Sequence, residues 1–349
     1  MTEEKSIRNR NIILAVLALV LILAAGAVAW FRFLKPATFF VFEQGEQKNV
    51  VQTASPAAVT ATEEIKKVIT MMFVGDIMLA RAVGDKMEKL DNWIWPFEKI
   101  GEYLAGADLT FGNLEGAISE RGRNVGSIYS FRADPKVVEG LKHAGFDILS
   151  VANNHIGDWG KIAMDDTFKI LQDNGIEIAG GGLNEQEAHN AKIIEISGVK
   201  LGFLAYTALG AKYTEAVASS SGIAWSSKER IAQDISDAKK ISDFVVVSLH
   251  FGDEYKQAAN NFQKDVSRSA IDAGANLVVG HHPHVVQEIE QYKDGFIAYS
   301  LGNFIFDQSF SKETMEGMML KVILESKDVK SIEPVKISIS NSFQASLAE

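Results

Sequence analysis

From Lys67 onward, short apolar runs alternate with stretches in which apolar residues recur at helical spacing. Apolar runs of about four to eight residues bounded by glycine or asparagine are typical of buried strands, and their alternation with helices predicts an α/β fold. The predicted strands are Val68–Val74, Leu109–Phe111, Ile148–Val151, Ile176–Ala179, Ile193–Ile196, Leu201–Tyr206, Phe244–Leu249, Leu277–Val279 and Phe296–Ser300. The predicted helices are Val137–Ala144, Ile162–Asn174, Glu229–Lys240 and Phe262–Ala273.

Polar residues of a few types follow six of the predicted strands. They are Asp76, the pair Asn113 and Glu115, the run Asn153–His155, His250, the group His281, His282 and His284, and Asn303. Because ligands collect beyond the carboxyl ends of strands in open α/β sheets, we expect these side chains along one rim. Taken singly, a strand-end Asp or Asn is usually a turn former or helix cap, and a lone His a structural residue. The combination predicts a metal site or a polar catalytic site.

The types of these side chains indicate which metal they would bind. Carboxylate, amide and imidazole groups suit a divalent cation such as Zn²⁺, Mn²⁺ or Fe, and the absence of cysteine disfavours a soft metal. Three of the seven histidines fall at positions 281, 282 and 284. Such an H-x-H pattern is a moderate signal by itself, because its side chains can also straddle a turn with no metal between them.

Residues 12–31 form an uncharged, almost wholly apolar run. At about 1.5 Å per residue it would span roughly 30 Å, the thickness of the hydrocarbon core of a bilayer. Basic residues before it favour a cytoplasmic N-terminus. We therefore expect residues 1–11 in the cytoplasm, a transmembrane anchor over 12–34, a stalk over 35–66 and one domain over 67–349. The alternative is a cleaved signal peptide, and in either case most of the chain lies outside the cytoplasm.

The charge distribution limits the partners of the outer domain. The chain has 349 residues and a net charge of −10, and its first 35 residues carry five basic and two acidic side chains. The remainder therefore carries −13, which argues against nucleic acid or anionic lipid as its partner. With no cysteine in the chain, the domain must be stabilised by its core without disulfides.

Six stretches that contain the strand-end residues follow one another over about 240 residues. They are FVGDIMLAR (73–81), FGNLEGAIS (111–119), SVANNHIGDWG (150–160), SLHFGDEY (248–255), VVGHHPHVVQ (278–287) and YSLGNFIFDQ (299–308). By these stretches the sequence resembles the CapA family of bacterial capsule-synthesis proteins, the poly-γ-glutamate group, which is itself similar to the calcineurin-like metallophosphoesterases. The resemblance implies a four-layer αββα sandwich with the active site at one edge, in a membrane-anchored protein on the outer face of the cell.

The resemblance also assigns roles to residues that match the phosphoesterase pattern D-x-H, G-D, G-N-H, His and G-H-x-H. Asp76 matches the leading Asp, and Glu115 stands in for the carboxylate that bridges two metals. The implied catalytic residues are Asp76 and His155, the latter as general acid. The implied metal ligands are Asp76, Glu115, Asn154, His250, His282 and His284. His281 is left as a structural residue beside the ligands.

One departure from the pattern bears on the number of metal ions. The third position of D-x-H is Met78 here, and a thioether is a poor ligand for hard or borderline cations. The first metal site therefore lacks a histidine, so we expect one ion to bind tightly and a second weakly or not at all. Activation of water by a single metal ion is compatible with this change, whereas two-metal catalysis requires both sites.

These observations favour metal-dependent hydrolysis or transfer on a cell-surface polymer or its precursor. We expect Arg81, Asn113 and Asn303 to contact the substrate, although Arg81 could instead be a solvated helix charge. The main alternative is a non-enzymatic accessory protein that binds other subunits of a polymer synthase or exporter. Two further alternatives are a surface-polymer phosphoesterase unrelated to poly-γ-glutamate and a sugar-binding module with aromatic platforms.

Overall fold

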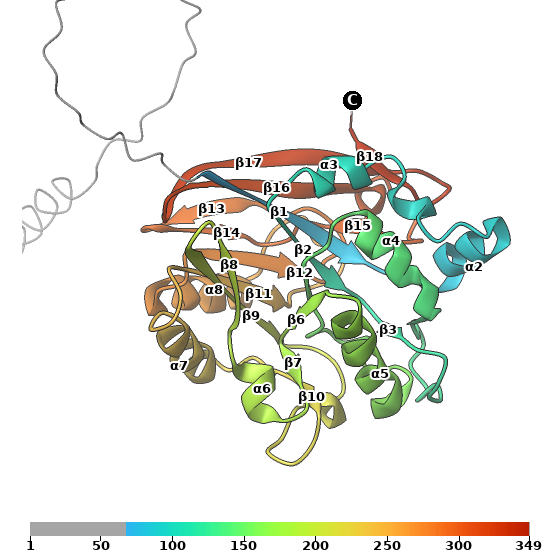
Figure 1. Cartoon of the computed structure of the whole chain (residues 1–349), viewed down its shortest axis with the longest axis horizontal. Helices are drawn as coiled ribbons and strands as arrows, with labels where there is room; N and C mark the ends of the chain where they lie inside the picture. Colours follow the sequence, from blue (N-terminus) through green and yellow to red (C-terminus); the bar gives the residue numbers. More distant parts are fainter. Residues whose placement is uncertain (1–67, 349) are drawn as a thin grey trace, which may run out of the picture. The chain divides into compact units, whose positions relative to one another are not determined.

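The computed structural model describes residues 68–348, and Figure 1 shows how their helices and strands are arranged. The predicted cytoplasmic segment, transmembrane anchor and stalk lie outside the described residues. Within 68–348, no helix is both long and apolar enough to cross a membrane. The described chain is a mixed α/β structure, as the alternation of apolar runs predicts.

The first sheet combines strands from the beginning and from the end of the described chain. It consists of β1 (Val68–Ile77), β2 (Leu109–Leu114), β5 (Ile148–Ser150), β6 (Glu177–Ala179), β15 (Asn303–Ile305), β16 (Glu316–Glu325), β17 (Asp328–Ile339) and β18 (Ala345–Leu347). The strand order is β18-β17-β16-β1-β2-β5-β6, and β15 also pairs with β1. Strands β1, β2, β5 and β6 run parallel to one another, and β15 runs parallel to β1. Strands β16, β17 and β18 are antiparallel to their neighbours.

The second sheet is built from the middle of the chain. It consists of β8 (Lys192–Ile196), β9 (Val199–Thr207), β11 (Phe244–His250), β12 (Leu277–His281), β13 (Ile289–Tyr292) and β14 (Gly295–Ala298), in the order β13-β14-β12-β11-β9-β8. Its four central strands are parallel and both edge strands are antiparallel. Two small ladders pair β3 (Ala117–Ile118) with β4 (Arg132–Ala133) and β7 (Gly181–Gly182) with β10 (Gly222–Ile223).

The described α-helices are α2 (Arg81–Leu90), α3 (Gly101–Ala105), α4 (Val138–His143), α5 (Gly160–Asp173), α6 (Glu185–His189), α7 (Lys228–Ala238) and α8 (Asn261–Ala273). Local signals fix the ends of α8. Asn260 and Gln263 form a capping box at its start, and Gly274 ends it in the left-handed conformation. These signals explain why the sequence pattern places α8 to within one residue.

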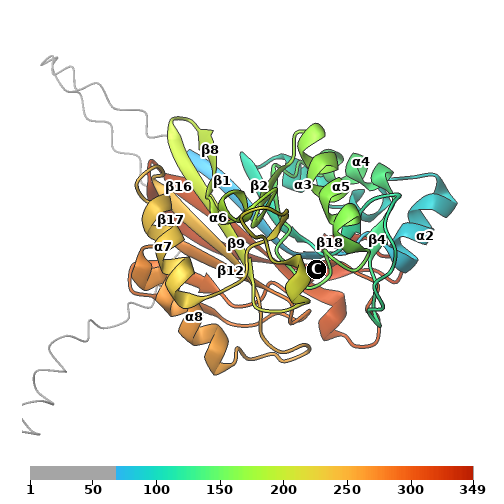
Figure 2. The same cartoon turned by 90° about the horizontal axis from the view of Figure 1, so that it is seen from below.

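The two large sheets pack face to face, with helices on the outer side of each (Figure 2). Phe111 of β2 stacks on Phe203 of β9 across the sheet interface, with ring centroids 5.8 Å apart. On β11, Val246 belongs to the same core cluster as these rings, whereas Val245 and Val247 pack among apolar residues of α7 and α8. A strand buried on both faces in this way gains about 1.5–3 kcal/mol for each buried valine.

Every predicted strand and helix is present, with ends shifted by a few residues. The sequence pattern did not predict α2, β13 or β15–β18, among others. In β17 most residues are exposed or half-buried and Pro334 interrupts the run, so the strand has little hydrophobic contrast. The omission affects the site, because β15 pairs with β1 and sets Asn303 beside Asp76.

Candidate metal centre

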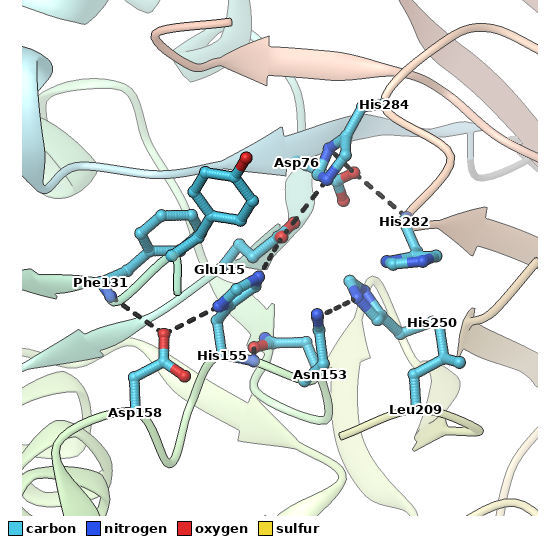
Figure 3. A network of polar contacts seen from close by, with 12 residues as sticks. Asp76, Glu115, Phe131, Asn153, His155, Asp158, Leu209, His250, His282 and His284 are labelled. Carbon is cyan, nitrogen blue, oxygen red and sulfur yellow. Dashed lines mark hydrogen bonds and ion pairs between the residues drawn. The ribbon is translucent and has the colours of Figure 1, made fainter. Parts of the chain in front are cut away.

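The strand ends deliver the expected polar side chains to one place. Pairing of β1 with β2 and β15 sets Asp76 opposite Asn113 and Asn303. Pairing of β11 with β12 sets His250 opposite His281 in the second sheet. Figure 3 shows side chains from both sheets pointing toward one another. The cluster therefore lies where the carboxyl ends of parallel strands from the two sheets meet.

Asp76 is the fully buried carboxylate at the middle of this cluster. The Asn113 amide donates to its Oδ1 at 2.9 Å, and the His282 backbone N–H donates to its Oδ2 at 3.1 Å. The Nδ1 atoms of His281 and His284 lie 3.2 and 3.3 Å from the same carboxylate. Burial alone raises the pKa of Asp76, but contacts with these two histidines hold it well below its usual value, so Asp76 stays ionised.

Glu115 is a second buried carboxylate, and its Oε1 has no hydrogen-bond partner. This oxygen lies 3.8 Å from Nε2 of His155 and 3.6 Å from Nε2 of His284. Burial raises the pKa of Glu115 to about 7, although the charge on His284 opposes the shift. A buried carboxylate oxygen without a partner is costly unless a cation lies against it, so Glu115 fits a metal ligand.

His250 ends β11 between two asparagine side chains. Its Nε2 lies 2.7 Å from Oδ1 of Asn154, and its Nδ1 lies 3.4 Å from Nδ2 of Asn113. Burial and the neighbouring His282 hold the pKa of His250 well below its usual value, and burial with the charge on His284 lowers the pKa of His282 to about 4. Both imidazoles are therefore neutral near pH 7, the form that binds metal ions.

His284 differs from its neighbours. Burial acts to lower its pKa, but the charges of Glu115 and Asp76 outweigh burial and raise the pKa of His284 to about 9. Its Nδ1 also lies 3.0 Å from Oδ1 of Asn303. The proton on His284 balances the charge of two buried carboxylates, a role that a bound cation would take over.

Two groups of side chains in the described part of the chain have the spacing of metal ligands. In each group, one ligand atom from every member lies within 4.8 Å of the others. The groups are Asp76, Glu115 and His250, and Glu254, His282 and His284. This mixture of carboxylates and imidazoles fits a divalent cation. Glu254 was not among the ligands predicted from the sequence, although it lies four residues after His250 in the stretch SLHFGDEY.

His155 is held against Asp158, which sequence reasoning also missed. The His155 Nδ1 lies 2.7 Å from Oδ2 of Asp158, and that oxygen accepts the backbone N–H of Phe131 at 3.0 Å. Figure 3 shows the His155 ring between Asp158 and Glu115. The available signal was the H-x-x-D spacing within SVANNHIGDWG, because a carboxylate close in sequence can orient an imidazole.

The three side chains expected to contact substrate have different surroundings. Asn113 and Asn303 are fully buried and hydrogen-bond to Asp76 and His284 respectively. Arg81 is partly exposed, and its guanidinium lies 2.8 Å from a carboxylate oxygen of Asp307. The two asparagines therefore orient other members of the cluster, while Arg81 lines an adjoining cleft.

Met78 follows Asp76 by two residues but belongs to neither donor group. It is fully buried in the main hydrophobic cluster. Its sulfur accepts the backbone N–H of Ala80 at 3.2 Å. Met78 is therefore packed as a core side chain.

Two clefts lead to the buried cluster, and His155 lines both. The smaller cleft has a volume of about 160 Å³ and also reaches Arg81 and His284. The larger has a volume of about 540 Å³ and also reaches Asn154 and His282. A substrate would contact His155 and the donor groups through these openings.

The backbone around the cluster is unusually constrained. His282 and His284 have φ values of 96° and 58°, in the left-handed region that non-glycine residues rarely adopt. Such conformations cost about 1–3 kcal/mol each and gather at functional sites, where the surrounding structure enforces them. Here the His282 backbone N–H is held by Asp76, which keeps both imidazoles at the rim.

Comparison with known proteins agrees with the sequence patterns. Residues 70–308 match the family model described as "Bacterial capsule synthesis protein PGA_cap". "Capsule biosynthesis protein CapA" of Bacillus anthracis is 29% identical over 346 residues, which cover 97% of this chain and 78% of that protein. "PGA biosynthesis protein CapA" of Bacillus subtilis is 31% identical over 275 residues, covering 78% and 72%. A "Probable polyglutamine synthesis accessory protein" of Mycobacterium tuberculosis is 26% identical over 67% of this chain and 65% of that protein.

Among solved structures, a hypothetical protein from Thermus thermophilus is similar with a TM-score of 0.49 and 14% identity, covering 77% of this chain and 98% of that one. The calcineurin-like phosphoesterase YfkN from Bacillus subtilis is similar with a TM-score of 0.41 and 12% identity, covering 78% and 91%. The family assignment rests on the sequence match, which includes the strand ends that supply both donor groups. This chain belongs to the bacterial capsule synthesis protein PGA_cap family.

Proposed function

We propose that this protein acts in capsule (poly-γ-glutamate) biosynthesis as a membrane-anchored protein with its main domain outside the cytoplasm. In this proposal the domain has the metallophosphoesterase-type αββα sandwich and carries a metal-dependent hydrolase-like site. Its substrate is a cell-surface polymer or the precursor of one. Names of similar proteins, "PGA biosynthesis protein CapA" among them, support the process, and the site supports the chemistry.

The observation that carries the proposal is the convergence of donor groups around Glu115. Its Oε1 has no hydrogen-bond partner and is buried between imidazoles that come from different parts of the chain. A purely structural cluster would satisfy this oxygen with a hydrogen bond, because an unpaired buried acceptor costs about 1–3 kcal/mol or more. A divalent cation bound here would satisfy this oxygen instead.

Each part of the site then has a chemical task. The bound cation supplies Lewis-acid polarisation and a lowered pKa for water. Asp76, Glu115, Asn154 and His250 would hold one ion, with His282 and His284 beside it. His155, oriented by Asp158, would protonate the leaving group from the nitrogen that faces Glu115. Arg81 would bind an anionic group of the substrate after its ion pair with Asp307 is broken.

Metal content tests the proposal. Full-length protein purified in detergent and dialysed against Mn²⁺ or Zn²⁺ should retain metal, and His250→Ala and His282→Ala should each lose part of it. His143→Ala is the matched control, because His143 is an exposed histidine on α4, outside both donor groups. Metal retention that is equal in all three variants would remove the metal centre from the proposal.

The absence of cysteine allows a direct test of topology. A cysteine at the exposed turn residue Asp294 (Asp294→Cys) should react with a membrane-impermeant maleimide in intact cells. Thr2→Cys should react only after the membrane is opened. The reverse pattern would place the domain in the cytoplasm.

A second function, that of a non-enzymatic accessory subunit, is favoured by one feature. Met78 is a core side chain where the phosphoesterase pattern has a metal-binding histidine. The accessory role is also the one printed in the name of the Mycobacterium tuberculosis relative. Metal binding without turnover of any phosphodiester or peptide polymer would favour this role over hydrolysis.

A further inference from the structure

Glu254 is an exposed carboxylate that lies close to two histidines of the site, His282 and His284. One of its oxygens and one nitrogen each from His282 and His284 lie within 4.8 Å of one another. His282 is only 7% exposed, and its Nδ1 has no hydrogen-bond partner in the described structure. An exposed carboxylate beside two buried imidazoles, one of which has a nitrogen without a hydrogen-bond partner, is an arrangement that a cation would complete.

The segment that carries Glu254 is fastened to the histidine-bearing turn. The backbone N–H of Tyr255 donates to the carbonyl of Pro283 at 2.8 Å, between His282 and His284 in the sequence. Tyr255 adopts a left-handed φ of 61°, a conformation that its surroundings must enforce. Glu254 is therefore held at its position by the backbone of the next residue.

The Tyr255 side chain adds a second attachment. Its ring packs 6.1 Å from the ring of His284 and 5.1 Å from that of Phe310, and Gln308 donates to its hydroxyl at 3.2 Å. Farther along, Gln287 donates to the carbonyl of Lys256 at 2.7 Å. A surface carboxylate on an unattached loop would be weak evidence for a ligand, but Glu254 is fixed against the turn by contacts of the two residues that follow it.

A further carboxylate is chemically useful at this position. The strand that supplies Asp76 offers no other donor, because Met78 is a core side chain whose sulfur accepts a backbone N–H. His282 and His284 by themselves form a neutral pair of donors once metal replaces the proton, and two neutral donors hold a divalent cation weakly. A carboxylate supplies the charge and third ligand that a metal site with an open position requires.

We propose that Glu254 is a metal ligand, which with His282 and His284 forms a cation site beside the Asp76, Glu115 and His250 group. The inference rests on the proposed function in that it requires the cluster to bind metal. The inference goes beyond the proposed function because it assigns a metal ligand that is not part of the phosphoesterase pattern. The fitting ions are Mn²⁺ and Zn²⁺, which accept mixed carboxylate and imidazole ligands.

The test compares Glu254→Gln with Asp253→Asn in the full-length protein. Both variants remove one negative charge from adjacent exposed positions, but only Glu254 belongs to a donor group. Metal content after dialysis and a Mn²⁺ titration followed by calorimetry measure stoichiometry and Kd. We expect Glu254→Gln to weaken one class of Mn²⁺ sites by at least about tenfold and Asp253→Asn to leave both values unchanged. Glu254→His, which restores a donor, should recover Zn²⁺ binding.

The outcomes separate this inference from the proposed function. If Glu254→Gln keeps the wild-type stoichiometry and Kd while His250→Ala loses metal, the cluster binds metal and Glu254 is not a ligand. If Glu254→Gln and Asp253→Asn weaken binding equally, the effect is long-range charge and the assignment fails. If the wild-type protein takes up neither Mn²⁺ nor Zn²⁺, the proposed function fails together with it. Circular dichroism of each variant verifies that it is folded.

Discussion

Asp158 accepts two hydrogen bonds, one from the backbone N–H of Phe131 and one at the Nδ1 side of His155. The first contact fixes the carboxylate and the second fixes the imidazole ring. As a result the Nε2 atom of His155 faces Glu115 at 3.8 Å, on the side where the donor groups lie. An imidazole oriented in this way can deliver a proton from a single defined nitrogen.

This pairing predicts that Asp158→Asn lowers turnover of a phosphodiester with a poor leaving group. His155→Ala should reduce kcat by about 10²–10⁴-fold, the usual contribution of a general acid, and Asp158→Asn by a smaller factor, because the imidazole is retained but less well oriented. Metal content should stay at the wild-type value in both. With a p-nitrophenyl leaving group, which needs little protonation, both losses should shrink. Equal losses with the two substrates would exclude His155 as the acid.

Met78 gives a second prediction at the residue scale. Met78→His should lower the free energy of unfolding by about 1–3 kcal/mol, because it buries a polar group without a partner, and it should leave metal stoichiometry unchanged. Met78→Leu is the control and should cost less than about 1.5 kcal/mol. Urea denaturation and elemental analysis measure the two quantities. An additional metal ion at unchanged stability would instead mean that this position faces a vacant ligand site.

At the scale of secondary-structure elements, the site depends on a close backbone contact between the end of β1 and Gly302, the residue just before β15. Gly75 allows this approach, because a Cβ atom there would lie 1.9 Å from the carbonyl oxygen of Gly302. The backbone N–H of Asp76 donates to the same oxygen at 3.0 Å. The backbone contact therefore sets the position of the central carboxylate.

We predict that Gly75→Ala destabilises the fold by at least about 1–3 kcal/mol and lowers metal affinity, because the β1 end must move and carry Asp76 with it. Gly106→Ala is the matched control. Gly106 has a φ of −77°, and the nearest atom to a Cβ there would be 3.5 Å away, so its effect should stay within about 1 kcal/mol. Thermal unfolding and metal titration measure both effects. A Gly75→Ala variant with wild-type stability and affinity would show that the close approach is not required.

At the scale of the described domain, the site lies between two sheets, and helices cover the outer face of each sheet. One core cluster includes the sheet interface, and the other lies between the second sheet and α7 and α8. The described members of both clusters all lie at Ile69 or later in the chain. The Asp76, Glu115 and His250 group takes members from both sheets, and relative movement of the sheets would separate them.

It follows that a recombinant fragment of residues 67–349 should be soluble and monodisperse without the N-terminal 66 residues. Size-exclusion chromatography with light scattering checks the size, and calorimetry checks for a cooperative transition. Its metal content should equal that of the full-length protein. Aggregation of the fragment under conditions in which the full-length protein in detergent is well behaved would place the domain boundary earlier in the chain.

The sequence by itself determined the order of the main strands and helices and the polar residues at the strand ends. Those features depend on local periodicity and on turn chemistry, which act over a few residues. The matching stretches also identified the family, and they contain the members of both donor groups. The antiparallel strands β16–β18 were not predicted from the sequence. In β17 the reason is that most residues are exposed or half-buried, so apolar and polar positions differ little.

Only the tertiary structure decided how these side chains act on one another. His282 and His284 are two residues apart, yet the pKa of the first falls to about 4 and that of the second rises to about 9. Burial acts to lower both pKa values, but at His284 the charges of Glu115 and Asp76, which come from other parts of the chain, outweigh it. Glu254 comes close to His282 and His284 through the same kind of contact, between residues that are distant in the sequence. Long-range contacts of this kind leave no periodic trace in the sequence, and so they appear only once the chain is folded.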